Sequence, residues 1–156
     1  MRKVAVENPR RCYCGASGCL SAHCSVTGIV KQICERRGRR APTILRTINL
    51  FHDFVRDARA GDPSAREVFE RAGQLLGTAI ANHINASDPG RIIISVFDAS
   101  LSELLSSEVL YWLRKNTLAP LHKRTAVEFK TIPGDYYLKG SAALVLEQIF
   151  RSPPNL

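Results

Sequence analysis

The chain has 156 residues, 45% of them hydrophobic, which suits one domain with its own core and argues against wholesale disorder. No apolar run reaches the roughly 18–20 residues that a membrane-spanning helix needs, and the basic start lacks the apolar centre of a signal peptide. We therefore expect a cytoplasmic protein with no membrane partner.

The net charge of +8 is confined to the first part of the chain. Residues 1–46 carry ten Lys or Arg against two Glu, whereas residues 47–156 carry twelve of each sign. Such a basic segment can bind phosphates, so nucleic acid is a candidate partner of residues 1–46. A solvated loop explains the same charge equally well, and both interpretations stay open.

Residues 1–19 are predicted to form a loop that contains three closely spaced thiols. Cys12, Cys14 and Cys19 lie within eight residues, and the glycines between them allow a tight turn. Zinc prefers four ligands in a tetrahedron, and thiolates are its usual structural donors. Because clustered thiols in a reducing compartment indicate metal more often than disulfide, we predict a zinc site here. The alternative is a set of reduced thiols buried as small apolar groups.

The fourth zinc ligand is less well defined by the sequence. If a helix begins near Cys19, His23 lies one turn further on and shares its face, so we predict His23 as the ligand. Cys24 is the competitor, about 100° further round the helix. A site closed by solvent also stays open.

The rest of the chain alternates helical and extended patterns. Apolar residues at spacings of three and four predict helices over 20–37, 44–60, 62–87, 100–116 and 140–150. A β-branched run at 91–96 predicts a strand covered on both faces, and strict alternation predicts a second strand at 126–132. This order favours an α/β layer with a small sheet, to which other chain would have to add strands.

The cysteine spacing resembles the ROK family of repressors and sugar kinases. The family motif Cys-x-Cys-Gly-x-x-Gly-Cys-Leu-Glu is matched at Cys12, Cys14, Gly15, Gly18, Cys19 and Leu20. Later segments resemble the family in the expected order, at Asp62-Pro63, Leu76-Gly77, Asp88-Pro89 and 139–144. The resemblance implies one ROK-type C-terminal domain over residues 1–156, with a zinc loop at 12–24 and a tail at 152–156. The implied fold is the C-terminal lobe of an actin-like, ribonuclease H-like ATPase: α/β, helix-rich and incomplete.

Three positions depart from the family pattern. The family's zinc takes an upstream His, at a position occupied here by Arg2 or Lys3. The Glu after Cys-Leu, which contacts the sugar in kinase members, is Ser21, so a sugar ligand is expected to bind more weakly. Residues 96–98 replace a Gly-rich turn that helps to hold adenine.

The resemblance also implies that the phosphate loop, the catalytic Asp and most sugar contacts lie in a first lobe outside this sequence. A direct search finds no Gly-rich phosphate loop. We therefore expect a truncated or degenerate ROK-type protein, related to sugar-responsive transcriptional regulation and without kinase activity of its own.

Two alternatives remain. One is the C-terminal half of a sugar kinase that phosphorylates hexoses with ATP once an N-terminal lobe is supplied. The other is a zinc-dependent nucleic-acid-binding module. We expect the protein partner to be an N-terminal ROK lobe or a second copy of the chain.

Overall fold

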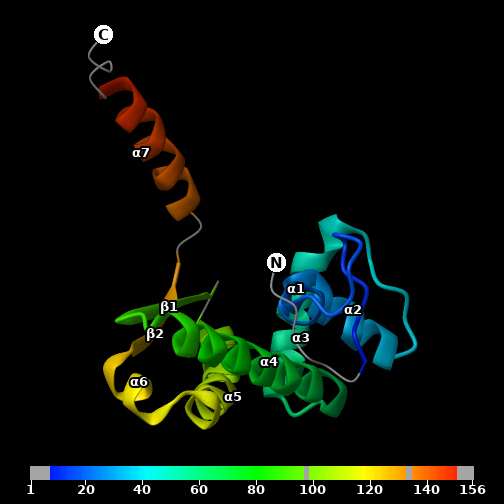
Figure 1. Ribbon diagram of the computed structural model, residues 1–156. Helices are drawn as coiled ribbons and strands as arrows, with labels where there is room; N and C mark the ends of the chain where they lie inside the picture. Colours follow the sequence, from blue (N-terminus) through cyan, green and yellow to red (C-terminus); the bar gives the residue numbers. More distant parts are fainter. Residues whose placement is uncertain (1–7, 97–98, 133–134, 151–156) are drawn as a thin grey trace.

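The computed structural model describes residues 8–96, 99–132 and 135–150. Within these residues the helices and strands are α1 (Leu20–Cys24), α2 (Val26–Arg36), α3 (Ile44–Arg59), α4 (Pro63–Ser87), β1 (Arg91–Val96), α5 (Ala99–Asn116), α6 (Ala119–Arg124), β2 (Ala126–Thr131) and α7 (Tyr136–Phe150). The long helix α4 runs through the middle of the fold, with α1–α3 at one end and α5, α6 and the sheet at the other (Figure 1). The predicted tail at 152–156 lies outside the described residues.

The predicted helix over 20–37 is wrong in one respect, because it is two helices. Ser25 adopts extended backbone between them, at φ −75° and ψ 162°. Its hydroxyl accepts a hydrogen bond from the Gly28 N–H and so caps the start of α2. Gly28 is required at this break, since a Cβ there would lie 2.7 Å from the Ala22 carbonyl oxygen.

The hydrophobic core lies where α2, α3, α4 and α5 meet. Its buried members include Ile33, Phe54, Phe69 and Val109. Asp62 caps α4 by accepting a hydrogen bond from the Ala65 N–H, with Pro63 at the first helical position. The core therefore places α1 against α4, where the Cys24 thiol donates to the Ala72 carbonyl.

The two strands form a parallel pair, joined through α5 and α6. Ile92 lies opposite Val127 and Ile94 opposite Phe129, and Ile94 and Phe129 pack against the core. The expectation that β1 is covered on both faces is not met, because its exposure alternates and Ile93 is 52% exposed. Helix α6 was not predicted, since six residues are too few to show a helical period.

Helix α7 extends away from the other elements (Figure 1). It is apolar on all sides, and its large side chains are exposed. They are Leu138, Leu144, Val145, Leu146, Ile149 and Phe150. A helix that is apolar all round is normally buried, so α7 lacks a cover within the described residues. None of the described helices is long and apolar enough to cross a membrane.

Candidate functional site

The predicted thiol loop folds into a tight turn at the edge of α1. Arg11 and Ser17 form an antiparallel bridge, and the Cys12 N–H donates to the Ala16 carbonyl at 2.8 Å. Gly15 and Gly18 have φ of 87° and 76°, a backbone conformation that side chains other than glycine rarely adopt. These two glycines allow the tight turn that the motif predicts.

The turn brings the three predicted thiols together. The sulfurs of Cys12, Cys14 and Cys19 all lie within 4.8 Å of one another, and those of Cys14 and Cys19 are 3.6 Å apart. A tetrahedral zinc site with Zn–S bonds of about 2.3 Å has sulfur–sulfur edges of about 3.8 Å. Cys12 and Cys19 are buried and Cys14 is exposed. The thiol cluster, these three residues, therefore fits three corners of a zinc site.

The thiols differ in how readily they ionise. The backbone N–H of Cys14 and the hydroxyl of Ser21 donate toward Cys12 and lower its pKa to about 7. Burial and, after it, the two neighbouring thiols raise the pKa of Cys19 to about 11. Cys12 therefore offers a thiolate, the form that binds metal, more readily than Cys19 does.

His23 and Cys24, the two candidates for the fourth ligand, take different surroundings on α1. His23 is not among the residues of the thiol cluster, but it is buried and its Nε2 has no hydrogen-bond partner among the described residues. Burial lowers the pKa of His23, as do Arg10 and Arg71, so the imidazole is neutral at pH 7. The Cys24 thiol instead donates to the Ala72 carbonyl on α4, and burial raises its pKa to about 12. The upstream position, Arg2 or Lys3, lies outside the described residues.

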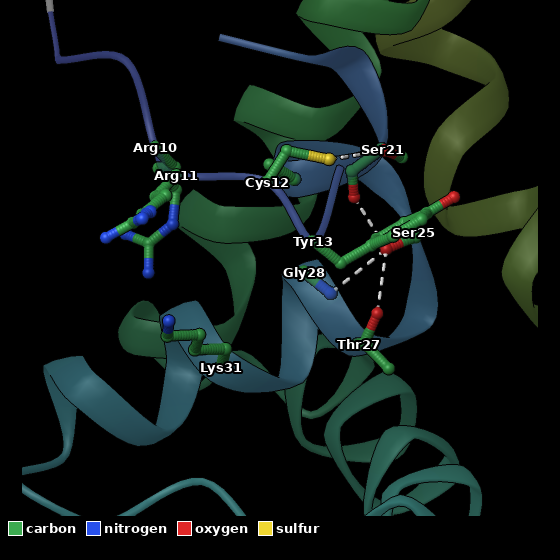
Figure 2. Close-up of a pocket in the computed structure, with 10 residues that line it drawn as sticks. Arg10, Arg11, Cys12, Tyr13, Ser21, Ser25, Thr27, Gly28 and Lys31 are labelled. Atoms are coloured by element: carbon green, nitrogen blue, oxygen red, sulfur yellow. Dashed lines mark hydrogen bonds between the residues drawn. The ribbon is translucent and has the colours of Figure 1, made fainter. Parts of the chain in front are cut away.

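A pocket of about 370 Å³ lies beside the thiol loop (Figure 2). One side carries cations and the other carries hydroxyl groups. We call it the basic pocket and define it by Arg10, Arg11 and Lys31 with Ser21, Ser25 and Thr27. Cys12 also lines it, so the pocket and the thiol cluster share a wall.

Part of the basic run at 36–40 is held in ion pairs rather than free. Arg36 pairs with Glu67 on α4. Arg37 donates to Asp57 and Asp62 at 2.9 Å each and lies over the Phe54 ring, 4.8 Å from its centroid. The interpretation of residues 1–46 as a phosphate-binding segment therefore loses two of the four arginines at 36–40.

A comparison with protein-family models gives a match to the ROK family over residues 3–146. The chain belongs to the ROK family. Its curated relatives include the DNA-binding transcriptional repressor Mlc of Escherichia coli K12, 25% identical over 142 residues that cover 90% of this chain and 35% of the repressor. The N-acetyl-D-glucosamine kinase of Pectobacterium carotovorum is 26% identical over 145 residues, covering 92% of this chain and 44% of the kinase. The chain thus spans less than half the length of either ROK relative.

Solved ROK structures share the fold. A crystal structure of a ROK family transcriptional regulator, a homologue of the E. coli MLC protein, matches with a TM-score of 0.66 and 28% identity over 81% of this chain and 33% of that one. A ROK family glucokinase from Streptomyces griseus, in complex with glucose and AMPPNP, matches with a TM-score of 0.69 and 21% identity over 92% of this chain and 49% of the glucokinase. The predicted helix-rich α/β ROK fold is confirmed.

The basic pocket was not predicted from the sequence. Arg10 and Arg11 stand next to Cys12 in the sequence, which is a weak signal, but Lys31 is 20 residues away from Arg11. Only the folded thiol loop brings the two arginines beside α2, where Lys31 lies.

Proposed function

We propose that residues 1–156 are the zinc-stabilised C-terminal domain of a ROK-type sugar-responsive transcriptional regulator, a cytoplasmic protein without kinase activity of its own. The observation that carries the proposal is Ser21. By resemblance, kinase members have a sugar-contacting Glu at this position, and here a hydroxyl stands at the wall of the basic pocket, 3.6 Å from the Cys12 sulfur. The similarity to the repressor Mlc supports the same choice.

The proposed metal role is structural. Cys12, Cys14 and Cys19 would hold zinc, and His23 would supply the fourth ligand. A closed site of this kind contributes directly to folding, because the unfolded chain has no preformed site. The support for His23 over Cys24 is a neutral imidazole whose Nε2 has no hydrogen-bond partner among the described residues. The Cys24 thiol, in contrast, already donates to the Ala72 carbonyl. Zinc would thus fix the loop that carries Arg10 and Arg11.

Metal analysis tests the structural site. Protein purified without added zinc is expected to hold one zinc per chain by mass spectrometry, and Cys14→Ser is expected to lower this content. Cys34→Ala is the control, because Cys34 lies in the core and outside the thiol cluster. Zinc below about 0.2 equivalents in the wild type, with all five thiols freely titratable, would contradict the proposal, since structural zinc binds with apparent energies of ~10 kcal/mol or more.

An activity assay tests the proposal that the chain has no kinase activity of its own. With ATP and a panel of hexoses and N-acetylhexosamines, the chain is expected to show no turnover above background, while a ROK glucokinase serves as the positive control. Phosphorylation that follows the protein peak through purification would overturn the proposal.

The second candidate is half of a ROK sugar kinase. Its support is the coverage, because the chain spans 44% of the N-acetyl-D-glucosamine kinase and 46% of the glucokinase of Halalkalibacterium halodurans. ATP binding that appears only after a first lobe is added would favour it. A nucleic-acid-binding module has less support, since Arg36 and Arg37 are engaged in ion pairs.

A further inference from the structure

The three thiols of the thiol cluster differ in their access to solvent. Cys12 and Cys19 are 5% and 2% exposed, whereas Cys14 is an exposed residue of the loop. A small oxidant in solvent therefore reaches Cys14 more readily than it reaches the other two. Thiols that are accessible and lie beside a second thiol oxidise reversibly, because the neighbour captures the first oxidation product. Cys14 has the position of such a reactive thiol.

Cys19 has the position of the thiol that captures this product. The sulfurs of Cys14 and Cys19 are 3.6 Å apart, so a small movement of the loop would bring them to the disulfide bond length of about 2.05 Å. The four residues between them, 15–18, begin and end with a glycine at positive φ. Because glycine adopts a wide range of backbone angles, this segment can adjust as the two sulfurs approach.

The remaining cysteines are worse placed to pair with Cys14. Cys12 is separated from it by one residue, which leaves little backbone to adjust, and its sulfur lies 3.6 Å from the Ser21 hydroxyl (Figure 2). The Cys24 thiol donates to a backbone carbonyl of α4. Cys34 is 2% exposed and lies in the hydrophobic core. The geometry therefore favours one pair among the five thiols.

We propose that the thiol cluster is a redox-sensitive site, at which a hydroperoxide oxidises Cys14 and Cys19 to a disulfide and the metal is released. The disulfide withdraws two of the three thiolates that would hold the metal, and only the thiolate form binds it. Cys12 and His23 alone do not complete the four-ligand set of a structural site. Disulfide formation follows from the positions of the thiols, whereas the release of the metal rests on the proposed zinc role.

The oxidation takes place in two steps. In the first, the Cys14 thiolate attacks one oxygen of the peroxide, so that an S–O bond forms, the O–O bond breaks and hydroxide leaves, taking a proton from solvent to become water. In the second, the Cys19 thiolate attacks the Cys14 sulfur, so that the S–S bond forms, the S–O bond breaks and a second water leaves in the same way. The two sulfurs together lose two electrons, and the peroxide gains them. A dithiol reductant reverses the change by thiol–disulfide exchange.

Peptide mapping of the oxidised whole chain tests the disulfide. Hydrogen peroxide is added, and the remaining thiols are then blocked with iodoacetamide. Chymotrypsin cleaves after Tyr13 and Leu20, which isolates a peptide with Cys14 and Cys19 as its only thiols. We expect this peptide to be unalkylated and lighter by two hydrogens than its reduced form, and dithiothreitol to restore the reduced form. Linkage of this peptide to the one that contains Cys12, or oxidation that ends as a sulfinic acid on Cys14, would overturn the proposal.

The release of zinc is followed in the same reaction with a metal-sensitive dye. One zinc is expected to leave for each disulfide formed, and the melting temperature is expected to fall, because a structural metal contributes to folding. A disulfide that forms while all the zinc is retained would also overturn the proposal. Protein isolated without zinc would contradict the zinc role of the proposed function, and the mapped peptide alone would then decide whether the disulfide forms.

Two substitutions separate the paired thiol from an uninvolved one. In Cys19→Ser, peroxide is expected to leave Cys14 as a sulfenic acid that dimedone labels at least about tenfold more than in the wild type, because the capturing thiol is absent. Cys34→Ala is the matched control and is expected to behave as the wild type, since Cys34 lies in the core. Circular dichroism verifies the fold of each variant, and the wild-type peptide map decides the question if Cys19→Ser does not fold. Equal dimedone labelling in Cys19→Ser and the wild type would contradict the role of Cys19.

Discussion

Two charged residues, Arg37 and Asp62, connect helices α2, α3 and α4. Arg37 follows the last residue of α2, and its guanidinium reaches Asp57 near the end of α3 and Asp62 at the start of α4. The same Asp62 carboxylate accepts from the Ala65 N–H at 2.8 Å. The Arg37 hydrogen bond and then the Ala65 N–H hold the pKa of Asp62 below its ordinary value of 3.8. One charged side chain therefore serves both as a helix cap and as the partner of Arg37.

The lowered pKa of Asp62 gives a prediction for acid stability. A carboxyl group with a lower pKa in the folded state stabilises the fold above its unfolded pKa, and this contribution is lost as the pH falls through the folded pKa. Asp62→Asn keeps a capping oxygen but removes the charge. We expect Asp62→Asn to melt below the wild type at pH 6, with the gap closing as the pH falls below 3.8. A gap in melting temperature that does not change between pH 6 and pH 3 would contradict this.

The fourth zinc ligand gives a second prediction at this scale. His23→Ala is expected to speed loss of zinc to a chelator far more than Cys24→Ala, because the Cys24 thiol already donates to Ala72. Zinc release is followed with a metal-sensitive dye on protein of verified fold. If only Cys24→Ala releases the metal, or if the two variants behave alike, His23 is not the ligand.

At the scale of elements, the crossing of α4 and α5 depends on two glycines. Gly73 and Gly77 allow α4 to pack closely against α5. A Cβ at Gly77 would lie 2.4 Å from the Val109 carbonyl oxygen, and one at Gly73 would lie 2.7 Å from the Glu108 Cβ. The Gly77 contact is the stricter one, because a backbone atom of α5 cannot turn aside as a side chain can.

Gly77→Ala tests this crossing. We expect it to destabilise the fold by about 2–3 kcal/mol, since overpacking forces the helices apart and costs more than the gain in helix propensity. Gly140→Ala in α7 is the control, because a Cβ there meets nothing within 4 Å, and it is expected to be neutral or slightly stabilising. Chemical denaturation measures both. If the two substitutions change the free energy of unfolding equally, the crossing of α4 and α5 has room for a Cβ at Gly77 and the prediction is wrong.

For the molecule as a whole, the small sheet and the uncovered helix α7 indicate that this chain is part of a larger assembly. The described residues contribute two parallel strands, which are few for a stable sheet, and α7 exposes large apolar side chains on all sides. The chain also spans only 35% of the repressor Mlc and 44% of the kinase relative. We propose that a ROK N-terminal lobe covers α7, because that lobe is the part of the relatives that this chain does not match.

Sedimentation tests the cover of α7. The first lobe of the Mlc repressor, added as a separate polypeptide, is expected to form a one-to-one complex with the chain. The double substitution of Leu144→Lys and Ile149→Lys is expected to abolish the complex, whereas Leu118→Lys, an equally exposed site outside α7, is not. A discrete dimer of the chain that the added lobe leaves unchanged would assign α7 to a second copy instead.

Structural features that depend only on residues close together in the sequence could be predicted from it. The Asp62–Pro63 helix start, the helical periods of α3, α4 and α5, and the glycine-bearing thiol motif each lie within a short stretch of chain. The break at Ser25 was missed because the apolar period continues across it and the bend is set by a cap and a close approach of Gly28 to α1. Helix α6 was also missed, because it is too short to show a helical period of apolar residues.

Only the folded structure shows which element covers each face of a strand or helix, and which side chains far apart in the sequence come into contact. The parallel pairing of β1 and β2 and the hydrogen bond from Cys24 to Ala72 each join residues more than 30 positions apart. Ile93 is exposed because no element among the described residues covers it. The basic pocket has the same origin, since Arg11 meets Lys31 only after the thiol loop folds onto α2. Local patterns record the backbone period, whereas such contacts depend on how whole helices pack, which no short window of sequence contains.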